Sequence, residues 1–366
     1  MTSPPDPAPA VAAGSATDAI RFPRILQVCP NDHPPFRDIC DVYAAAGASL
    51  GCAVDTVYLT DLAAQGRSAS IAAGLRSHIA AGPEPLLAIC HRYRAYRTLR
   101  ATGLKLPRVV TIAHEFGFFE RLQRRLERRL FARNILFAGV SPAVQAELAA
   151  TVPGALCLPN GIDIDSLNAT LLSREAAQAE LGIVQGSFTI GLLGRLVEKK
   201  RPLLAIDALA ALQTDLPGAR LLVIGDGELR AVMEARAAGL PVDFCGFVPD
   251  ARRLLKGLDA LLLVSKDIEA FGMVALEAMV AGVPVVAGPS PGPRSVLGEI
   301  GFYFDRAEPA AIAQALQAVH QAAGSADAGL DAQLQQGIER ARREFSVAAV
   351  ARRLDDLFFQ GVPPGR

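Results

Sequence analysis

Two pairs of charged residues stand out by type and spacing. Arg195 and Lys200 lie five residues apart in GRLVEKKRP, and Glu269 and Glu277 lie eight apart in EAFGMVALE. A guanidinium and an ammonium in one loop can hold the same diphosphate, the arginine as a fork and the lysine as a point charge. A basic loop considered alone is more often simply solvated. A diphosphate-binding role for the basic pair is therefore favoured only in combination with the motifs that follow it.

The second pair surrounds the start of a helix predicted over 273–281. Two glutamates at such a place are more often a capping acid and a surface acid. Glu277, however, lies in the otherwise apolar stretch ALEAM, and a buried carboxylate is costly unless it is paired or hydrogen-bonded. The amides at the helix start favour an anionic ligand near Gly272. A sugar nucleotide would satisfy both features, with Glu269 on sugar hydroxyls and Glu277 on ribose hydroxyls.

These residues follow short apolar strands that alternate with helical segments, which is the pattern of parallel α/β domains. With 366 residues the chain exceeds the usual size of one core, so two doubly wound domains are expected. We expect a disordered cytoplasmic tail at 1–20, domains over 21–165 and 166–345, and a last helix at 346–360 that returns to the first domain. The predicted strands are 25–29, 54–59, 86–90, 109–113, 136–140, 156–158, 188–193, 220–224, 242–245, 260–264, 284–287 and 302–304.

Composition excludes several classes of protein. Lysine plus arginine equals aspartate plus glutamate at 37 each, so nothing overall indicates nucleic-acid binding. The six cysteines form no CxxC pair or His/Cys group with zinc spacing. No apolar run is long enough to span a membrane, and the N-terminus lacks the pattern of a secretory signal. A cytoplasmic protein without a metal or other cofactor is expected.

A glycine turn, GDG at 225–227, follows the strand at 220–224, and a structural turn and a ligand loop are equally consistent with it. Neither this turn nor the one at Gly194 is a GxGxxG fingerprint after the first strand of a βαβ unit. An NAD-dependent enzyme is therefore the less favoured alternative.

After residue 24 the chain resembles the retaining GT-B glycosyltransferases, in particular family 4. The resemblance rests on an ordered set of motifs, each weak alone: TIAHEFG around His114, GVSPAV around Ser141, NGID at 160–163, Gly194-Arg195 with Lys200, GDG at 225–227, GFV at 246–248, and Glu269-x7-Glu277 with Phe271-Gly272. The resemblance departs in two places. CPNDHPPF at 29–36 replaces a Gly-Gly loop, and GPSPGPR at 288–294 reads as a stiff loop without a role.

The resemblance implies two Rossmann-like domains facing a cleft, a UDP-sugar or GDP-sugar donor, and no obligatory metal. It places Arg195 and Lys200 on the diphosphate, Glu277 and Val274 on the nucleoside, and the backbone at Phe247 and Val248 on the base. His114, Glu269, Ala270, Phe271 and Gly272 would surround the donor sugar. His114, Glu269, Arg195 and Lys200 would be the catalytic group, with fixed cations stabilising the departing diphosphate. A sugar-nucleotide binder that has lost turnover is the non-enzyme alternative.

The acceptor side is less defined by the sequence. HRYRAYR follows the strand at 86–90, and its His91, Arg92 and Arg94 are candidates for contact with a saccharide or lipid-linked glycan. For any one of these residues, an ordinary basic helix start is the slightly favoured explanation. Residues 118–133 combine leucines four apart with arginines, which indicates either a helix on anionic lipid or a domain helix with a solvated basic face. Bacterial lipopolysaccharide, O-antigen or capsule assembly is the resulting hypothesis.

Overall fold

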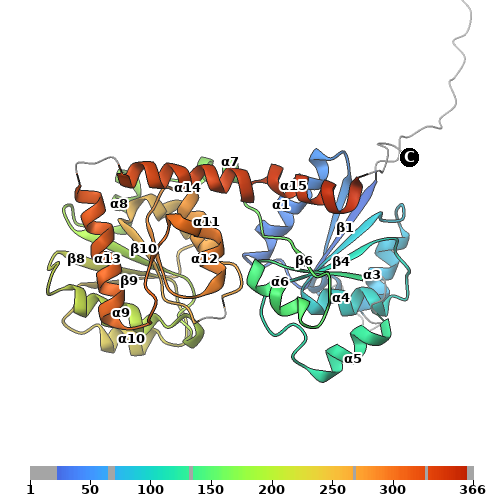
Figure 1. Ribbon diagram of the computed structural model, residues 1–366, viewed down its shortest axis with the longest axis horizontal. Helices are drawn as coiled ribbons and strands as arrows, with labels where there is room; N and C mark the ends of the chain where they lie inside the picture. Colours follow the sequence, from blue (N-terminus) through green and yellow to red (C-terminus); the bar gives the residue numbers. More distant parts are fainter. Residues whose placement is uncertain (1–22, 65–70, 132–134, 267–268, 326–328, 361–366) are drawn as a thin grey trace, which may run out of the picture.

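The computed structural model describes residues 23–64, 71–131, 135–266, 269–325 and 329–360. The predicted tail at 1–20 lies outside these residues. Within them the chain forms two parallel six-stranded sheets, each covered by helices (Figure 1). Every strand end falls within one residue of its predicted position. The α/β fold class with two doubly wound domains is thus confirmed.

The first sheet has the order β2-β1-β3-β4-β5-β6 and builds the N-terminal domain. Its central strands β1, β3 and β4 are buried throughout, as expected where helices cover both faces of a parallel sheet. They are β1 (Arg24–Cys29), β2 (Ala53–Tyr58), β3 (Leu87–His91), β4 (Val109–Ala113), β5 (Ile135–Gly139) and β6 (Leu156–Cys157). The helices are α1 (Phe36–Ser49), α2 (Leu59–Ala64), α3 (Ile71–Ala80), α4 (Arg92–Ala101), α5 (Leu122–Phe131) and α6 (Pro142–Ala149).

The second sheet has the order β12-β11-β10-β7-β8-β9 and builds the C-terminal domain. Its strands are β7 (Phe188–Leu193), β8 (Ala219–Ile224), β9 (Val242–Gly246), β10 (Ala260–Leu263), β11 (Val285–Ala287) and β12 (Phe302–Tyr303). The helices before and between them are α7 (Ile164–Thr170), α8 (Arg174–Leu181), α9 (Pro202–Leu212), α10 (Arg230–Arg236), α11 (Met273–Val280) and α12 (Pro291–Leu297), with short 3₁₀ segments at Glu198–Lys200, Ala251–Gly257 and Gly298–Ile300. After β12 come α13 (Pro309–Gly324) and α14 (Gly329–Phe345).

The chain passes between the domains twice, and the two passes touch. Ile162, on the way out of the N-terminal domain, forms a parallel bridge with Ser346, and its amide donates to the carbonyl of Phe345. Ser346 also caps α15 (Val347–Leu354), which packs against α1 and ends in a π-helical turn at Asp355–Phe359. In Figure 1 α14 and α15 run end to end along one side of both domains.

Apolar packing also links the domains. One cluster of buried side chains contains residues from the N-terminal sheet, from α11 and from α14 and α15. Smaller clusters lie on the outer face of each sheet. An ion pair adds a polar contact, because Arg252 Nη1 lies 3.2 Å from Asp38 Oδ2 of α1. The carboxyl ends of β7 and β10 are thereby held beside the N-terminal domain.

Candidate active site

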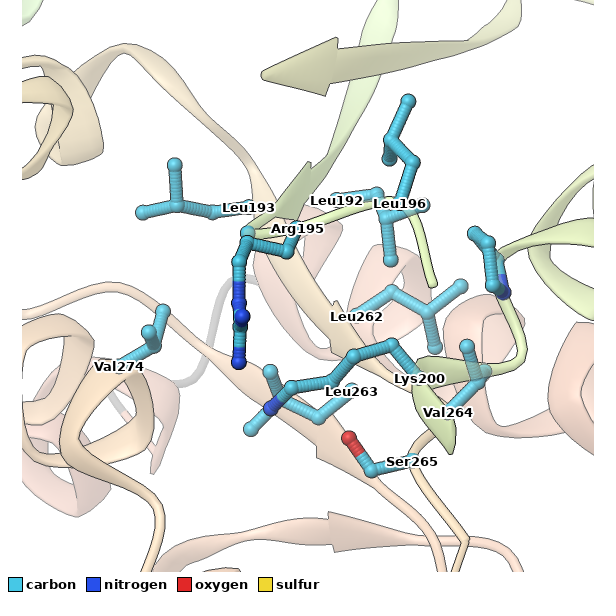
Figure 2. A pocket seen from close by; sticks show the side chains of 12 residues that line it. Leu192, Leu193, Arg195, Leu196, Lys200, Leu262, Leu263, Val264, Ser265 and Val274 are labelled. Atoms are coloured by element: carbon cyan, nitrogen blue, oxygen red, sulfur yellow. The ribbon is translucent and has the colours of Figure 1, made fainter. Parts of the chain in front are cut away.

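A hollow lies at the carboxyl ends of β7 and β10, where ligands bind in open parallel α/β sheets. It measures about 350 Å³, including its part open to solvent. Figure 2 shows the side chains of Arg195 and Lys200 extending toward the same space, near Ser265 and Val274. The lining residues are Leu192, Leu193, Gly194, Arg195, Leu196, Lys200, Pro202, Leu262, Leu263, Val264, Ser265 and Val274. Three residues predicted for nucleotide binding therefore share one hollow.

The two cations differ in their contacts. Lys200 Nζ donates to both carboxylate oxygens of Glu269, each at 2.9 Å, and the side chains are 31% and 16% exposed. Arg195 is exposed and has no ion pair within the described part of the chain. Burial, together with Arg195 and Lys200, lowers the pKa of the neighbouring Lys199. Concentrated positive charge with one uncompensated guanidinium is suited to an anionic ligand.

Glu269 is held by the segment at 288–294. The hydroxyl of Ser290, which is 2% exposed, accepts from the Glu269 amide at 3.2 Å. The amide of Gly292 donates to the Glu269 carbonyl at 3.1 Å, and a Cβ at Gly292 would lie 2.3 Å from that carbonyl oxygen. Only glycine permits this approach. The sequence reading of 288–294 as a stiff loop without a role was wrong, since Pro291 begins α12 and the segment fixes the backbone of Glu269.

Gly272 separates the two glutamates and starts α11. Its φ of 94° is in the left-handed region, which favours glycine, and it immediately precedes α11. Glu269 therefore lies before the helix and Glu277 within it, as predicted. Ala270, Phe271 and Gly272 are all buried. The donor-sugar contact predicted for these three residues stays a prediction.

Glu277 has an unusual electrostatic environment. Burial raises its pKa to about 7; Asp38 and Asp250 raise it further, and Arg252 opposes them. Arg252 is itself shared between Asp250 Oδ1, at 2.7 Å from its Nε, and Asp38. No hydrogen bond reaches the Glu277 carboxylate from the described residues. A partly buried acid left without donors is a candidate acceptor for ligand hydroxyls.

The glycine turns after β7, β8 and β9 are joined by backbone hydrogen bonds. The Gly225 amide donates to the Gly246 carbonyl at 2.8 Å, and the Leu196 amide donates to the Asp226 carbonyl at 2.9 Å. A Cβ at Gly225 would lie 1.9 Å from the Gly194 carbonyl oxygen, so the turns approach closely because they are glycines. Phe247, 77% exposed, and Val248 follow β9 at this same edge. Their predicted contact with a base stays a prediction.

On the N-terminal side His114 follows β4. Burial, with smaller contributions from His91 and Arg92, holds the pKa of His114 well below its usual value. The His114 ring packs edge-on against Phe36 at a centroid distance of 5.3 Å. The adjacent Glu115 acts electrostatically on Lys199 of the C-terminal domain. The loop after β4 therefore lies near the loop after β7, and the position of His114 opposite Glu269 stays a prediction.

The predicted acceptor residues occupy different environments. His91 is 0% exposed, and its Nδ1 lies 3.1 Å from Nε2 of His114. Direct contact between His91 and an acceptor is therefore not available in this structure, because its ring is enclosed between Gln27, His114 and Tyr43. Arg92, with φ 73°, forms an ion pair with Glu115, and Arg94 is exposed on α4. Arg92 and Arg94 stay predicted acceptor contacts.

Several residues near the site were not predicted from the sequence. Gln27, within β1, contacts His91, and Thr56, within β2, contacts Gln27. Ser290, Arg252 and Asp38 contact or face the two glutamates. Only GPSPGPR carried a signal, since a glycine between prolines indicates a required close approach. Within the described residues no cluster of three or more His, Cys, Asp or Glu has the arrangement of a metal site.

Comparison with known proteins places this site in a family. Residues 173–327 match the family described as "Glycosyl transferases group 1". This range holds Arg195, Lys200, Phe247, Glu269 and Glu277. The C-terminal domain is a member of the glycosyl transferases group 1 family. His114 and His91 lie outside the matched range.

Curated relatives of this glycosyltransferase domain share part of the chain. A GDP-mannose-dependent alpha-(1-6)-phosphatidylinositol dimannoside mannosyltransferase of Mycobacterium tuberculosis is 40% identical over 134 residues, which cover 34% of each chain. A phosphatidyl-myo-inositol mannosyltransferase of Mycobacterium leprae is 33% identical over 169 residues, 44% of this chain and 43% of the relative. The chain spans about a third to a half of the length of the curated relatives it matches.

Solved structures resemble the whole described fold. A glycosyltransferase from Rickettsia africae superposes with a TM-score of 0.77 at 15% identity, covering 93% of this chain and 98% of the other. HepE of Anabaena, solved with UDP and glucose, gives a TM-score of 0.73 at 20% identity, with 92% and 99% covered. At these identities the likeness concerns the fold alone, which is GT-B.

Proposed function

We propose that the protein transfers a sugar from a nucleoside-diphosphate sugar to a glycan or lipid-linked saccharide, with retention at the anomeric carbon and without a metal ion. One observation carries this proposal. Lys200 is paired with Glu269 beside the unpaired Arg195, at the carboxyl ends of β7 and β10. This ion pair places Lys200, which would bind the diphosphate, next to Glu269, which would contact the sugar. The family of the C-terminal domain and the names of its relatives support the same reading.

In this proposal each group has its own task. The guanidinium of Arg195 and the ammonium of Lys200 are fixed cations next to the position of the leaving diphosphate. Negative charge develops on that diphosphate as the glycosidic bond breaks, and preorganised cations stabilise it without solvent rearrangement. The acceptor hydroxyl attacks from the face that the diphosphate leaves, and a phosphate oxygen takes its proton. Glu269 then positions the sugar and forms no bond to it.

Thermal unfolding in the presence of UDP, GDP and their sugars tests this function. At a hundredfold excess over Kd, ligand binding stabilises by about 2.7 kcal/mol, which corresponds to a rise in Tm of roughly 3–4 °C for a chain of 366 residues. We expect such a rise with one of the two nucleotides, in EDTA as well as in magnesium. Arg195→Ala should abolish the rise, and Lys266→Ala, on the neighbouring loop, should retain it.

Two results would count against the proposal. Absence of any nucleotide-dependent rise would remove the sugar-nucleotide site. Binding without release of free sugar from the corresponding donor, over a long incubation with no acceptor, would favour a binding protein over an enzyme.

We further propose that the acceptor is an anionic-membrane glycolipid or lipid-linked glycan, as in lipopolysaccharide, O-antigen or capsule assembly, met at the cytoplasmic face of the plasma membrane. The supporting observation is the orientation of α5. Leu122, Leu126 and Leu130 are 70%, 48% and 68% exposed, so its leucines face outward. No helix among the described residues has the length and hydropathy of a membrane span. The two related proteins named above carry phosphatidylinositol dimannoside and phosphatidyl-myo-inositol, both lipids, in their names.

Two arginines connect α5 to the residues just before it and to α4. Arg124 Nη1 donates to the carbonyl of Phe118 at 3.0 Å and its guanidinium lies over Tyr93, and Arg125 Nε donates to the carbonyl of Phe119 at 2.7 Å. Arg121 and Arg129 are exposed beside the leucines. An outward apolar stripe flanked by cations matches an anionic bilayer, to which each near-surface basic residue adds about 1 kcal/mol.

Vesicle flotation tests the membrane contact. Leu122→Gln with Leu130→Gln changes only exposed side chains, so folding should be retained. We expect binding to vesicles containing phosphatidylglycerol to fall about tenfold or more, because each leucine loses roughly 1.5 kcal/mol or more of burial. Val232→Gln, at a 52% exposed position on α10, is the control and should float like the unmodified protein. Unchanged flotation of the double variant, or equal binding to neutral vesicles, would refute the membrane assignment.

A further inference from the structure

Four polar side chains form a hydrogen-bonded row across the carboxyl half of the N-terminal sheet. They come from β2, β1, β3 and the end of β4, which are neighbours in the sheet order. Gln27 Nε2 lies 3.0 Å from Thr56 Oγ1, Gln27 Oε1 lies 3.1 Å from His91 Nε2, and His91 Nδ1 lies 3.1 Å from His114 Nε2. Thr56 lies at the outer end of the row, and His114 lies at the end that faces the C-terminal domain.

The direction of every hydrogen bond in the row is fixed from one end. Gln27 Nε2 also donates to the Cys40 carbonyl at 2.9 Å, and a carbonyl can only accept. The amide oxygen of Gln27 must therefore face His91, so His91 Nε2 carries a proton. A neutral imidazole has one such proton, which leaves His91 Nδ1 as an acceptor. His114 Nε2 must then donate to it, and the remaining ring nitrogen of His114, Nδ1, carries a lone pair.

The surroundings of the two rings support the neutral form. Burial lowers the pKa of His91 to about 4, and burial followed by His91 and Arg92 lowers that of His114. Tyr43 packs edge-on against His91 at 5.5 Å and Phe36 against His114 at 5.3 Å, so neither ring is free to turn over. No hydrogen bond to His114 Nδ1 arises from the described residues. One acceptor nitrogen is thus available to a ligand.

We propose that the row Thr56–Gln27–His91–His114 fixes His114 as a neutral imidazole with its proton on Nε2, so that Nδ1 accepts a hydrogen bond from a hydroxyl of the transferred sugar. Gln27 and His91 are positioning residues, and His114 is the group that touches the sugar. The proposal rests on the proposed glycosyl transfer and deepens it. It makes the N-terminal contact with the donor a neutral acceptor, which does not compete with Arg195 and Lys200 for the phosphates.

Nitrogen NMR of the [15N]histidine-labelled protein tests the tautomer without any ligand. The chain has five histidines, and single substitutions assign their signals. At neutral pH we expect His91 and His114 both to carry the proton on Nε2 and a lone pair on Nδ1. A proton on Nδ1 of His114, or a charged His114 ring, would overturn the proposal. Thr111→Val, a buried position on β4 outside the row, is the matched control and should leave both signals in place.

The kinetics of Gln27→Leu distinguish a role of Gln27 in orienting His114 from a role in folding. The side chains are similar in volume, but leucine cannot accept from His91 Nε2, so His114 loses its fixed tautomer. We expect kcat to fall about tenfold, as for one misdirected hydrogen bond, while the Kd of UDP or GDP stays within twofold. Unchanged kcat would overturn the proposed role. A protein that binds neither nucleotide but shows the expected tautomers would refute the proposed function and leave the row itself intact.

Discussion

Glu277→Gln is expected to weaken UDP or GDP binding about tenfold to a hundredfold while stabilising the ligand-free protein above pH 7. A hydrogen bond to a charged group contributes roughly 1.5–3 kcal/mol, and glutamine replaces the carboxylate with a neutral amide. The carboxylate is partly buried, and no described residue donates a hydrogen bond to it, so ligand hydroxyls would supply what the protein does not. Binding energy and folding stability therefore change in opposite directions at this one position.

The pH dependence follows from the raised pKa. Burial raises the pKa of Glu277 from its usual value of 4.5 to about 7. The folded state thus prefers the protonated acid, so the stability is fully present below pH 4.5 and is lost as the pH rises through about 7. The difference corresponds to roughly 3 kcal/mol above pH 7. Glu277→Gln should remove this loss, since an amide does not titrate.

Binding has the opposite sign, because the ionised carboxylate is the better acceptor for hydroxyls. The affinity of the unmodified protein for UDP or GDP should fall as the pH decreases below about 7, and the affinity of Glu277→Gln should not depend on pH in that range. Thermal unfolding from pH 5 to 8 and calorimetric titration measure the two effects. Glu299→Gln, at an exposed position in the same domain, is the control. Equal nucleotide affinity of Glu277→Gln and the unmodified protein at pH 8 would remove Glu277 from the ribose site.

The strands were predictable because most are short, largely apolar runs bounded by turn residues, such as Phe188–Leu193 before Gly194. Buried parallel strands need this composition, and it is local. The side-chain pairings were not predictable, because they join distant segments. Lys200 and Glu269 are 69 residues apart, and Arg252 and Asp38 are 214 apart. The sequence around a charged residue does not indicate which distant residue will form its ion pair.

For helix α5, the sequence predicted the helix but not its orientation. Its leucine period predicts an amphipathic helix, but periodicity does not reveal which side faces the domain. Arg124 faces the domain, because its guanidinium lies over Tyr93 and donates to the carbonyl of Phe118. Arg125 is exposed and reaches back to the carbonyl of Phe119 just before the helix. The long aliphatic stems of the arginines also pack while their heads donate. The leucines face outward as a result, opposite to the ordinary arrangement of a domain helix.

Lys200→Met is expected to reduce kcat by about a hundredfold to a thousandfold, the effect of removing one preorganised group that stabilises transition-state charge. Without donor the ammonium is occupied by Glu269, at 2.9 Å from both carboxylate oxygens. A bound diphosphate offers Lys200 a stronger partner, and Glu269 is released toward the sugar. Before the donor binds, the ion pair therefore satisfies both charged groups. Steady-state kinetics, with the donor that thermal unfolding identifies, measure the decrease in kcat.

The exchange of partners makes Glu269→Gln behave differently from Lys200→Met. Replacing the carboxylate by an amide frees Lys200 from its ion pair, so UDP or GDP should bind as tightly as before or a few times more tightly. The kcat falls because the sugar loses its charged acceptor and meets a weaker amide oxygen. Lys266→Met is the matched control, since Lys266 forms a comparable pair with Glu198 at 3.0 Å on the adjacent loop. Its kcat should stay within twofold. If Lys200→Met retained kcat within threefold, or Glu269→Gln lost nucleotide affinity with its kcat unchanged, the division between a phosphate-binding cation and a sugar-positioning acid would be refuted.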